Sequence, residues 1–233
     1  MIRALDVATS LGATLARLGS GAQTGALGER PAQALQLYEF EACPFCRKVR
    51  EALSILDLDA DVFPCPKNGP RFRPEVVRRG GKAQFPWLVD PNCGVEMYES
   101  DAIVRHLFER YGDGRVPLSL ALGPLTDVSA QLASAWRLGT GRVYERARAP
   151  EKPLELWSFE ASPFCRIARE KLCTLELPYR LHNVAKGSPK RPEFERRSGN
   201  MMVPYLVDPN TGKEMFESAD IVRYLEDTYA VRA

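Results

Sequence analysis

The stretch YEFEACPFCRKV at residues 38–49 occurs a second time, as WSFEASPFCRIA at residues 157–168. In both copies an alternating segment rich in strand formers leads into a proline that can open a helix. The change that bears on chemistry is at one position, where Cys43 of the first copy is replaced by Ser162 in the second. The chain therefore carries the same strand-to-helix corner twice, once with two cysteines and once with one.

The repeat extends well beyond this corner. The stretch FPWLVDPNCGVEMYESDAIVRHLFERYG at 85–112 is matched by VPYLVDPNTGKEMFESADIVRYLEDTYA at 203–230. Glycine and proline concentrate at 112–125, as expected of a join between units. We therefore predict a tandem duplication, with one domain over residues 1–118 and a second over residues 119–233.

Each unit shows the same succession of periodicities. The expected elements of the first unit are, in order, a strand at 34–40, a helix from Pro44, a strand at 59–64, a short helix at 73–81, a hairpin at 86–99 and a helix with Ser100 as its N-cap. Because RLGSG at 17–21 is answered by RLGTG at 137–141, each unit also includes a leading helix, expected at residues 1–18 in the first. The order βαβαββα predicts an α/β fold, a helix-covered sheet with a mixed edge.

Composition excludes several classes of protein. The 233 residues are 45% hydrophobic and 27% charged, with a formal net charge of only +2, so nothing indicates a nucleic-acid partner. No apolar run approaches the roughly 18 residues that a membrane helix needs, and no secretory signal is evident. We expect a soluble intracellular protein with no membrane partner, either cytoplasmic or in the plastid stroma.

The six cysteines are expected to be reduced thiols, because disulfide frameworks belong to short secreted chains with small cores. A structural zinc site needs more ligands than the pair Cys43 and Cys46 provides. The other cysteines form no close pair, and His106 and His182 are far apart in sequence. We therefore expect no metal site.

Cys43 and Cys46 have the spacing of a redox-active pair. Cys43 ends the first strand just before the helix, whose free amides and positive dipole end stabilise a thiolate, so we expect Cys43 to be the nucleophile. Cys46 lies one helical turn further, within reach of a disulfide, so we expect it to resolve the mixed disulfide. Two inert buried cysteines are the alternative interpretation.

Three motifs together resemble a known family. CPFC after a strand, the proline of FPWLVD and the start of ESDAIVRHL resemble glutaredoxins and the N-terminal, thioredoxin-fold domain of glutathione S-transferases. All but the first cysteine recur in the second copy. The resemblance implies two tandem thioredoxin-like domains, glutathione as co-substrate, and no all-helical domain of the transferase type.

The resemblance also implies a binding site for glutathione. Pro86 and Pro204 would be cis, the backbone of the preceding residue would pair with the cysteinyl part of glutathione, and the acidic-Ser pair would hold its γ-glutamyl end. An ordinary helix cap is the alternative for that pair. The glutathione-binding residues expected in the first unit are Phe45, Phe85, Pro86, Glu99 and Ser100. The corresponding residues of a degenerate site in the second unit are Ser162, Cys165, Val203, Pro204, Glu217 and Ser218.

Some features depart from this family, and several functions stay open. Glu39 and Glu41 would raise the pKa of Cys43, against the helix dipole. Basic loops containing Lys67 and Lys186 could meet the glycine carboxylate of glutathione. We expect a glutaredoxin-type thiol-disulfide oxidoreductase that acts on disulfide or glutathionylated substrates, with a second unit that does not exchange. The alternatives are a non-catalytic module that binds glutathione or a protein, a transferase-like enzyme and an iron-sulfur protein.

Overall fold

The structure, a computed structural model, describes residues 9–10, 20–121 and 140–231. The first unit contains β1 (Leu35–Glu39), α2 (Pro44–Ile55), β2 (Ala60–Pro64), α3 (Phe72–Gly80), β3 (Trp87–Asp90), β4 (Val95–Met97) and α4 (Ser100–Tyr111), followed by the short α5 (Leu118–Ala121). The second unit contains β5 (Leu154–Ser158), α7 (Pro163–Thr174), β6 (Tyr179–Asn183), α8 (Arg191–Ser198), β7 (Tyr205–Asp208), β8 (Lys213–Phe216) and α9 (Ser218–Tyr229). Both units have the expected βαβαββα order.

Two details of the element predictions need comment. Glu99, with a φ of 68°, holds the N-cap position of α4, and Ser100 is the first helical residue, so the prediction that Ser100 is the cap was wrong. Of the helix expected at residues 1–18, only Thr9 and Ser10 are described, and both are helical. The rest of it, and most of its counterpart before residue 140, lie outside the described residues.

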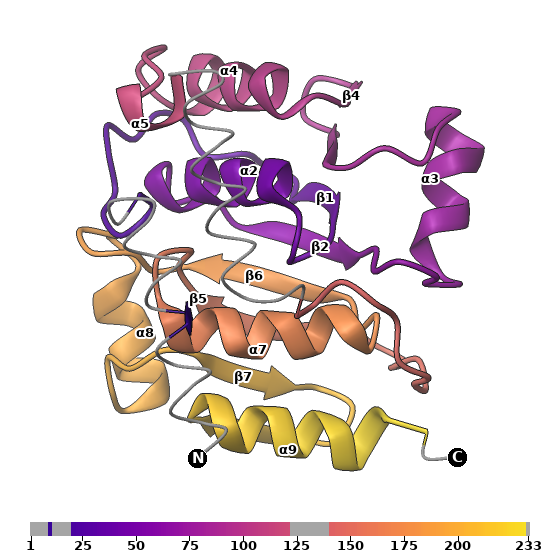
Figure 1. Cartoon of the computed structure of the whole chain (residues 1–233). Coiled ribbons are helices and arrows are strands. Elements are labelled where there is room, and N and C mark those ends of the chain that lie inside the picture. The colour runs from indigo at the N-terminus through magenta and orange to yellow at the C-terminus, as the bar shows by residue number, and fades with distance from the viewer. Residues whose placement is uncertain (1–8, 11–19, 122–139, 232–233) are drawn as a thin grey trace.

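The strands of the two units form one continuous sheet (Figure 1), in the order β4-β3-β1-β2-β6-β5-β7-β8. Within each unit the first two strands are parallel and the hairpin is antiparallel. The units meet where β2 pairs antiparallel with β6, with Asp61 opposite Arg180. One edge strand of each unit, β2 or β6, is thereby covered by the other unit, and β4 and β8 form the two edges of the joint sheet.

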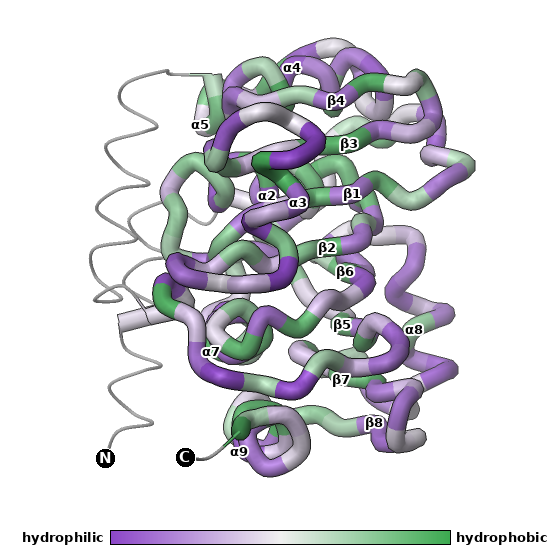
Figure 2. Tube along the Cα trace, turned by 90° about the vertical axis from the view of Figure 1, so that its right-hand side faces the viewer, coloured by the Kyte–Doolittle hydropathy of each residue, from purple (hydrophilic) through white to green (hydrophobic). Residues whose placement is uncertain are grey.

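Helices cover both faces of the sheet. In Figure 1, α4, α2, α7 and α9 follow one another from top to bottom on one face. Leu35 and Leu37 of β1 pack in the core beneath α2 and α4, whereas Tyr38 packs with Val76 of α3 on the opposite face. In Figure 2 the central strands are mostly hydrophobic, while α8 is mostly hydrophilic and buries only Phe194. The alternation along β1 thus serves two cores, one on each side of the sheet.

The segments that lead into the two units cross to the opposite unit. The Thr24 amide donates to the carbonyl of Lys186 at 2.8 Å. In the counterpart contact, the Tyr144 amide donates to the Lys67 carbonyl at 3.0 Å, and the Lys67 amide donates to the Arg142 carbonyl at 2.6 Å. The basic loops around Lys67 and Lys186 therefore bind the other unit. The domain boundary at residues 118 and 119 stays a prediction, because the segment that follows it lies outside the described residues.

Candidate functional site

Cys43 and Cys46 lie together at the start of α2. Cys43 is the N-cap, with extended backbone angles, and its sulfur accepts a hydrogen bond from the Cys46 amide at 3.3 Å. Pro44 fills the first helical position, where a missing amide costs nothing. Both cysteines are free and buried, and Cys43 is 3% exposed. The corner therefore places both sulfurs as the sequence predicts.

The surroundings of the two thiols separate their acidities. A hydrogen bond with the Cys46 thiol lowers the pKa of Cys43 below its ordinary value, burial opposes this, and the amides of Cys46 and Phe45 lower it further. The Glu39 carboxylate raises the pKa of Cys43, as expected from the sequence, but does not reverse the direction. Burial and the hydrogen bond to Cys43 raise the pKa of Cys46 well above its ordinary value. Cys43 is therefore the more acidic of the two thiols.

Aromatic rings stand beside the predicted glutathione-binding backbone. The bond between Phe85 and Pro86 is cis, as the resemblance implies, and so is the bond between Val203 and Pro204. The Phe85 ring meets Phe40 edge-on at 6.1 Å between centroids, and the Arg73 guanidinium lies 4.6 Å from the Phe85 ring centre. Arg73 also donates to the carbonyls of Cys65 and Pro66, at 3.0 and 2.6 Å. Its guanidinium is thus held over the rings beside the cis proline.

The acidic-Ser pair begins α4. Glu99 is exposed and accepts a hydrogen bond from the Gln84 side chain, whereas Ser100 is buried. Glu99 makes no side-chain bond to the helix it caps, so α4 starts with free amides. Phe45, which precedes Cys46, is 39% exposed. These positions leave an acidic side chain and unpaired amides available to a ligand with an ammonium and a carboxylate.

The second corner reproduces the first with oxygen in place of sulfur. Ser162 caps α7, and its Oγ accepts a hydrogen bond from the Cys165 amide at 3.3 Å, the same separation as at Cys43. Cys165 is fully buried, and burial raises its pKa. A hydroxyl and one protonated, buried thiol cannot form a disulfide at this corner.

The remaining residues expected in the second site line a cavity of about 290 Å³. Its lining consists of Phe164, Met201, Met202, Val203, Pro204, Glu217 and Ser218. Four of these were predicted from the sequence, and Phe164 is the counterpart of Phe45. Ser162 and Cys165 are not among the lining residues, so the cavity lies next to the corner and not over its hydroxyl.

A buried cluster of charged side chains lies between the two corners. The sequence did not predict this cluster. Glu160 lies 3.0 Å from Arg50 of the first unit and 2.7 Å from Arg169 of its own. Glu41, at the matching position of the first unit, lies 3.2 Å from Arg169. All these side chains are at most 2% exposed. The glutamate of each Phe-Glu-Ala motif thus pairs with the arginine of the opposite unit.

The acidity of this cluster is uneven. Burial raises the pKa of Glu39 to about 7, although Arg50 opposes it and Glu41 adds to it. Burial acts on Glu160 in the same sense, but Arg169 and Arg50 outweigh it and the pKa of Glu160 is lowered. Glu160 is therefore the anionic centre of the cluster, and Glu39 is a weaker acid than Glu160.

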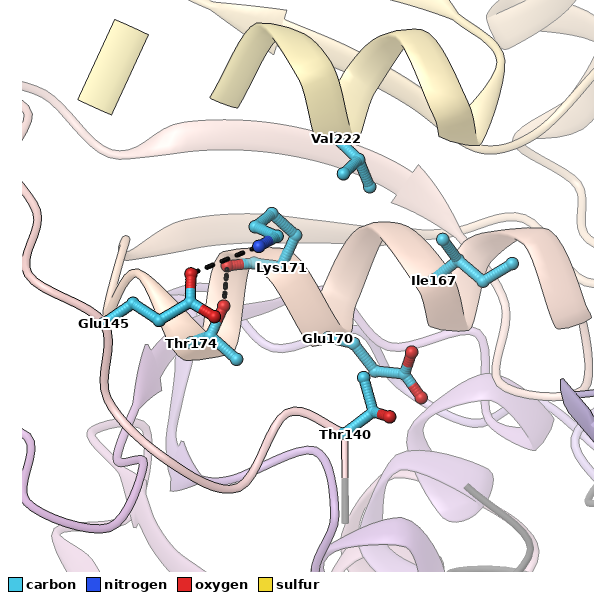
Figure 3. A pocket seen from close by; sticks show the side chains of 7 residues that line it. All are labelled: Thr140, Glu145, Ile167, Glu170, Lys171, Thr174 and Val222. Atoms are coloured by element: carbon cyan, nitrogen blue, oxygen red, sulfur yellow. Dashed lines mark hydrogen bonds and ion pairs between the residues drawn. The ribbon is translucent and has the colours of Figure 1, made fainter. Parts of the chain in front are cut away.

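A different cavity, of about 160 Å³, lies beside α7 and is drawn in Figure 3. Lys171 lines it, but its ammonium is held in ion pairs with Glu145 at 3.2 Å and Glu226 at 2.8 Å. It shares no lining residue with the cavity at Val203. We assign no chemistry to a cavity whose lysine is already paired twice.

Comparison with known proteins agrees with this architecture. The model of the family described as Glutathione S-transferase, N-terminal domain matches residues 37–115 and again residues 156–233. The chain belongs to this family. The resemblance inferred from the motifs is therefore confirmed, and so are the two tandem thioredoxin-like units of a glutathione S-transferase N-terminal domain protein. Within the described residues, an all-helical domain follows neither unit.

Two solved structures are similar to parts of the chain. The glutathione transferase BmGSTD1 of Bombyx mori is 29% identical over 36% of this chain and 38% of its own, with a TM-score of 0.32. The Leishmania protein TDR1, a trimeric glutathione transferase, is 15% identical over 87% of this chain and 68% of its own, with a TM-score of 0.31. The match thus spans well under half of the silkworm enzyme. No curated protein sequence matches the chain.

In the part of the chain that the structure describes, no helix has the length and apolarity to cross a membrane.

Proposed function

We propose that the chain is a glutathione-linked thiol-disulfide oxidoreductase of glutaredoxin type, with Cys43 as nucleophile and Cys46 as resolving thiol. The observation that carries this proposal is the position of the Cys43 sulfur, which caps the N-terminus of α2 and accepts a hydrogen bond from the amide of a second cysteine, Cys46. The lowered pKa of Cys43 and the raised pKa of Cys46 agree with the two roles. Glutathione is the co-substrate, and small disulfides or glutathionylated proteins are the substrates.

The reaction proceeds by two thiol-disulfide exchanges. The Cys43 thiolate attacks the glutathione sulfur of a glutathionylated substrate, forms a mixed disulfide and releases the substrate thiolate, which takes up a proton. A second glutathione thiolate then attacks the mixed disulfide, gives oxidised glutathione and regenerates the Cys43 thiolate. Alternatively Cys46, once deprotonated, displaces glutathione and forms an internal disulfide, which two further glutathione molecules reduce.

The glutathione site of the first unit is proposed at Phe45, Phe85, Pro86, Glu99 and Ser100. The backbone of Phe85 precedes a cis proline, and Glu99 and the free amides of α4 suit the charged γ-glutamyl end. The cavity at the same positions of the second unit supports this site, because it brings the counterparts of all five residues together around one space.

A glutathionylated peptide assay tests the proposal. Cys43→Ser should abolish glutathione-dependent reduction, and Cys46→Ser should keep part of it, because glutathione itself can resolve the mixed disulfide. Cys165→Ser is the matched control, since this thiol is buried behind Ser162 and should leave the rate unchanged. Full activity in Cys43→Ser would refute the proposed reaction.

A non-catalytic module is the second candidate, and the cavity beside Ser162 favours it for the second unit. That unit keeps the glutathione-binding positions but lacks the exchanging sulfur. Calorimetry and the peptide assay together separate the two candidates. A non-catalytic module binds glutathione equally in wild type and in Cys43→Ser, and neither protein reduces the glutathionylated peptide.

A further inference from the structure

Three side chains with metal-binding atoms converge at the end of β3, away from both corners. The ligand atoms of Asp90, Cys93 and His106 all lie within 4.8 Å of one another. His106 Nε2 lies 2.8 Å from Asp90 Oδ2 and 4.0 Å from Cys93 Sγ. The same imidazole nitrogen faces both partners, which excludes a relay in which the two ring nitrogens serve different groups.

We infer that Asp90, Cys93 and His106 form a binding site for one zinc ion. One thiolate, one imidazole and one carboxylate are the ligand types that zinc takes, whereas magnesium and calcium prefer oxygen alone. Ligands at zinc bond lengths in a tetrahedron are separated by about 3.4 Å for N and O and about 3.6 Å for N and S. Each of the two measured separations therefore needs to change by about 0.5 Å. The Cys93 end is exposed, so water supplies the fourth ligand.

The carboxylate is already oriented by its neighbours. Asp90 is fully buried, and its Oδ1 accepts from the backbone and side-chain amides of Asn92 at 3.0 and 2.9 Å. Its Oδ2 also accepts from the Tyr111 hydroxyl at 2.8 Å. Such outer contacts hold a ligand in place and commonly govern metal affinity by 10–100-fold.

The second unit provides an internal comparison. Asp208 accepts hydrogen bonds from Asn210 and Tyr229, as Asp90 does from Asn92 and Tyr111, so the set of hydrogen bonds around the carboxylate is repeated. The other two positions are Thr211 and Tyr224, whose hydroxyls lie 2.6 Å apart, and Tyr224 donates to Asp208 at 2.6 Å. The hydroxyl groups of Thr211 and Tyr224 therefore only form hydrogen bonds near Asp208. The first unit has a metal-binding side chain at each of these two positions.

The sequence did not predict this site. Asp90 precedes a turn that contains Cys93, but His106 comes 13 residues after Cys93, beyond β4 and in the second turn of α4. Only the folding of α4 back over the hairpin brings the three together.

Cobalt and zinc titrations of the full chain test the inference. Cys43→Ser/Cys46→Ser serves as the parent protein, so that the pair at α2 contributes no thiolate, and a phosphine reductant keeps Cys93 reduced. We expect one Co²⁺ per chain, with a sulfur-to-cobalt charge-transfer band and tetrahedral visible bands. Zn²⁺ should displace the cobalt, and competition with a chromophoric chelator gives its affinity.

Two variants of that parent decide the result. Cys93→Thr/His106→Tyr installs the residues of the second unit and should weaken zinc binding by more than about 100-fold, beyond the range of outer-shell changes. Tyr111→Phe should weaken it about 10-fold, as an outer-shell change does. Cys93→Ser, which keeps the turn and His106, should lose the charge-transfer band. Unchanged stoichiometry and affinity in Cys93→Thr/His106→Tyr, or a band that survives in Cys93→Ser, would overturn the inference.

Discussion

Arg50 of the first unit lies against Glu160 of the second, with Nε 3.0 Å from Oε2 and both side chains buried. The reciprocal pair, Arg169 and Glu41, is 3.2 Å apart and equally buried. Because each carboxylate follows the strand that leads to its own corner, the geometry of one corner depends on the presence of the other unit. The second unit therefore has a structural role in addition to any binding that it performs.

Removing the central carboxylate should destabilise the whole chain. Glu160→Gln leaves Arg50 and Arg169 buried with less negative charge, and breaking a buried ion pair in this way costs about 3–5 kcal/mol. Denaturant unfolding measures the change. Asp220→Asn is the matched control, because its pair with Arg223 is exposed at both ends and should contribute under about 1 kcal/mol. Equal effects of the two substitutions would show that the buried cluster is not a stabilising element.

The raised pKa of Glu39 makes stability depend on pH. Its pKa is about 7 in the folded chain against an ordinary 4.5, so ionising it costs the folded state free energy that grows as the pH rises through this range. Glu39→Gln should therefore gain stability relative to wild type between pH 4.5 and pH 8, by up to about 3 kcal/mol, the equivalent of that pKa difference. Paired unfolding curves at pH 5 and pH 8 check this. A difference that stays constant with pH, or shrinks, contradicts the assignment.

Alkylation kinetics should show which group activates Cys43. The Cys46 thiol is the main influence that lowers the pKa of Cys43, so Cys46→Ala should move the pH profile of Cys43 alkylation upward. In wild type the profile should lie below that of an ordinary cysteine. Peptide mass spectrometry after timed alkylation assigns the rate to Cys43. An unchanged profile in Cys46→Ala would mean that the helix amides alone activate the thiolate.

Glutathione binding should depend on the acidic-Ser pair. Glu99→Ala/Ser100→Ala should weaken binding measured by calorimetry without unfolding the unit, because the Glu99 side chain makes no cap bond to α4. The matched change Glu217→Ala/Ser218→Ala reports on the second cavity. If neither double substitution changes the affinity for glutathione, the acidic-Ser pairs only begin their helices and do not bind the ligand.

Ser162→Cys should restore a disulfide at the second corner. Ser162 has backbone angles of −72° and 121°, close to −78° and 123° at Cys43, and accepts the same amide hydrogen bond. Under oxidising conditions the new thiol should bond to Cys165, and the peptide that holds both should lose the mass of two hydrogen atoms, whose electrons the oxidant takes up. Added turnover in a Cys43→Ser background would show that the second cavity binds glutathione productively. Failure to form the bond contradicts a shared architecture of the two corners.

The order of elements was predictable because the duplication supplied each pattern twice. The strand before Cys43, the helix from Pro44 and the hairpin before α4 all lie where the periodicity placed them. Both cis prolines follow from the family resemblance, not from spacing. The N-cap of α4 was misplaced because Glu99 reaches the cap position with a positive φ, which sequence preference does not indicate.

Contacts between the units could not be predicted in the same way. Glu39 and Glu41 suggested an effect on the Cys43 thiol, because nothing in a single unit shows that Glu41 faces an arginine of the other. The pairing of β2 with β6 depends likewise on which edges meet, a choice that local patterns do not encode. The backbone hydrogen bonds of Lys67 and Lys186 to the other unit were not predictable for the same reason.

The buried cluster is not symmetric, although the fold around it is. Glu39 ends β1, but the same position at the end of β5 is Ser158, so only one of the two units adds a third carboxylate to the centre. In a dimer of identical chains, every substitution would appear in both subunits at once. In a fused pair each half can change alone. Covalent linkage thus permits one half to keep a reactive sulfur while its twin gives up that sulfur and retains the shared scaffold.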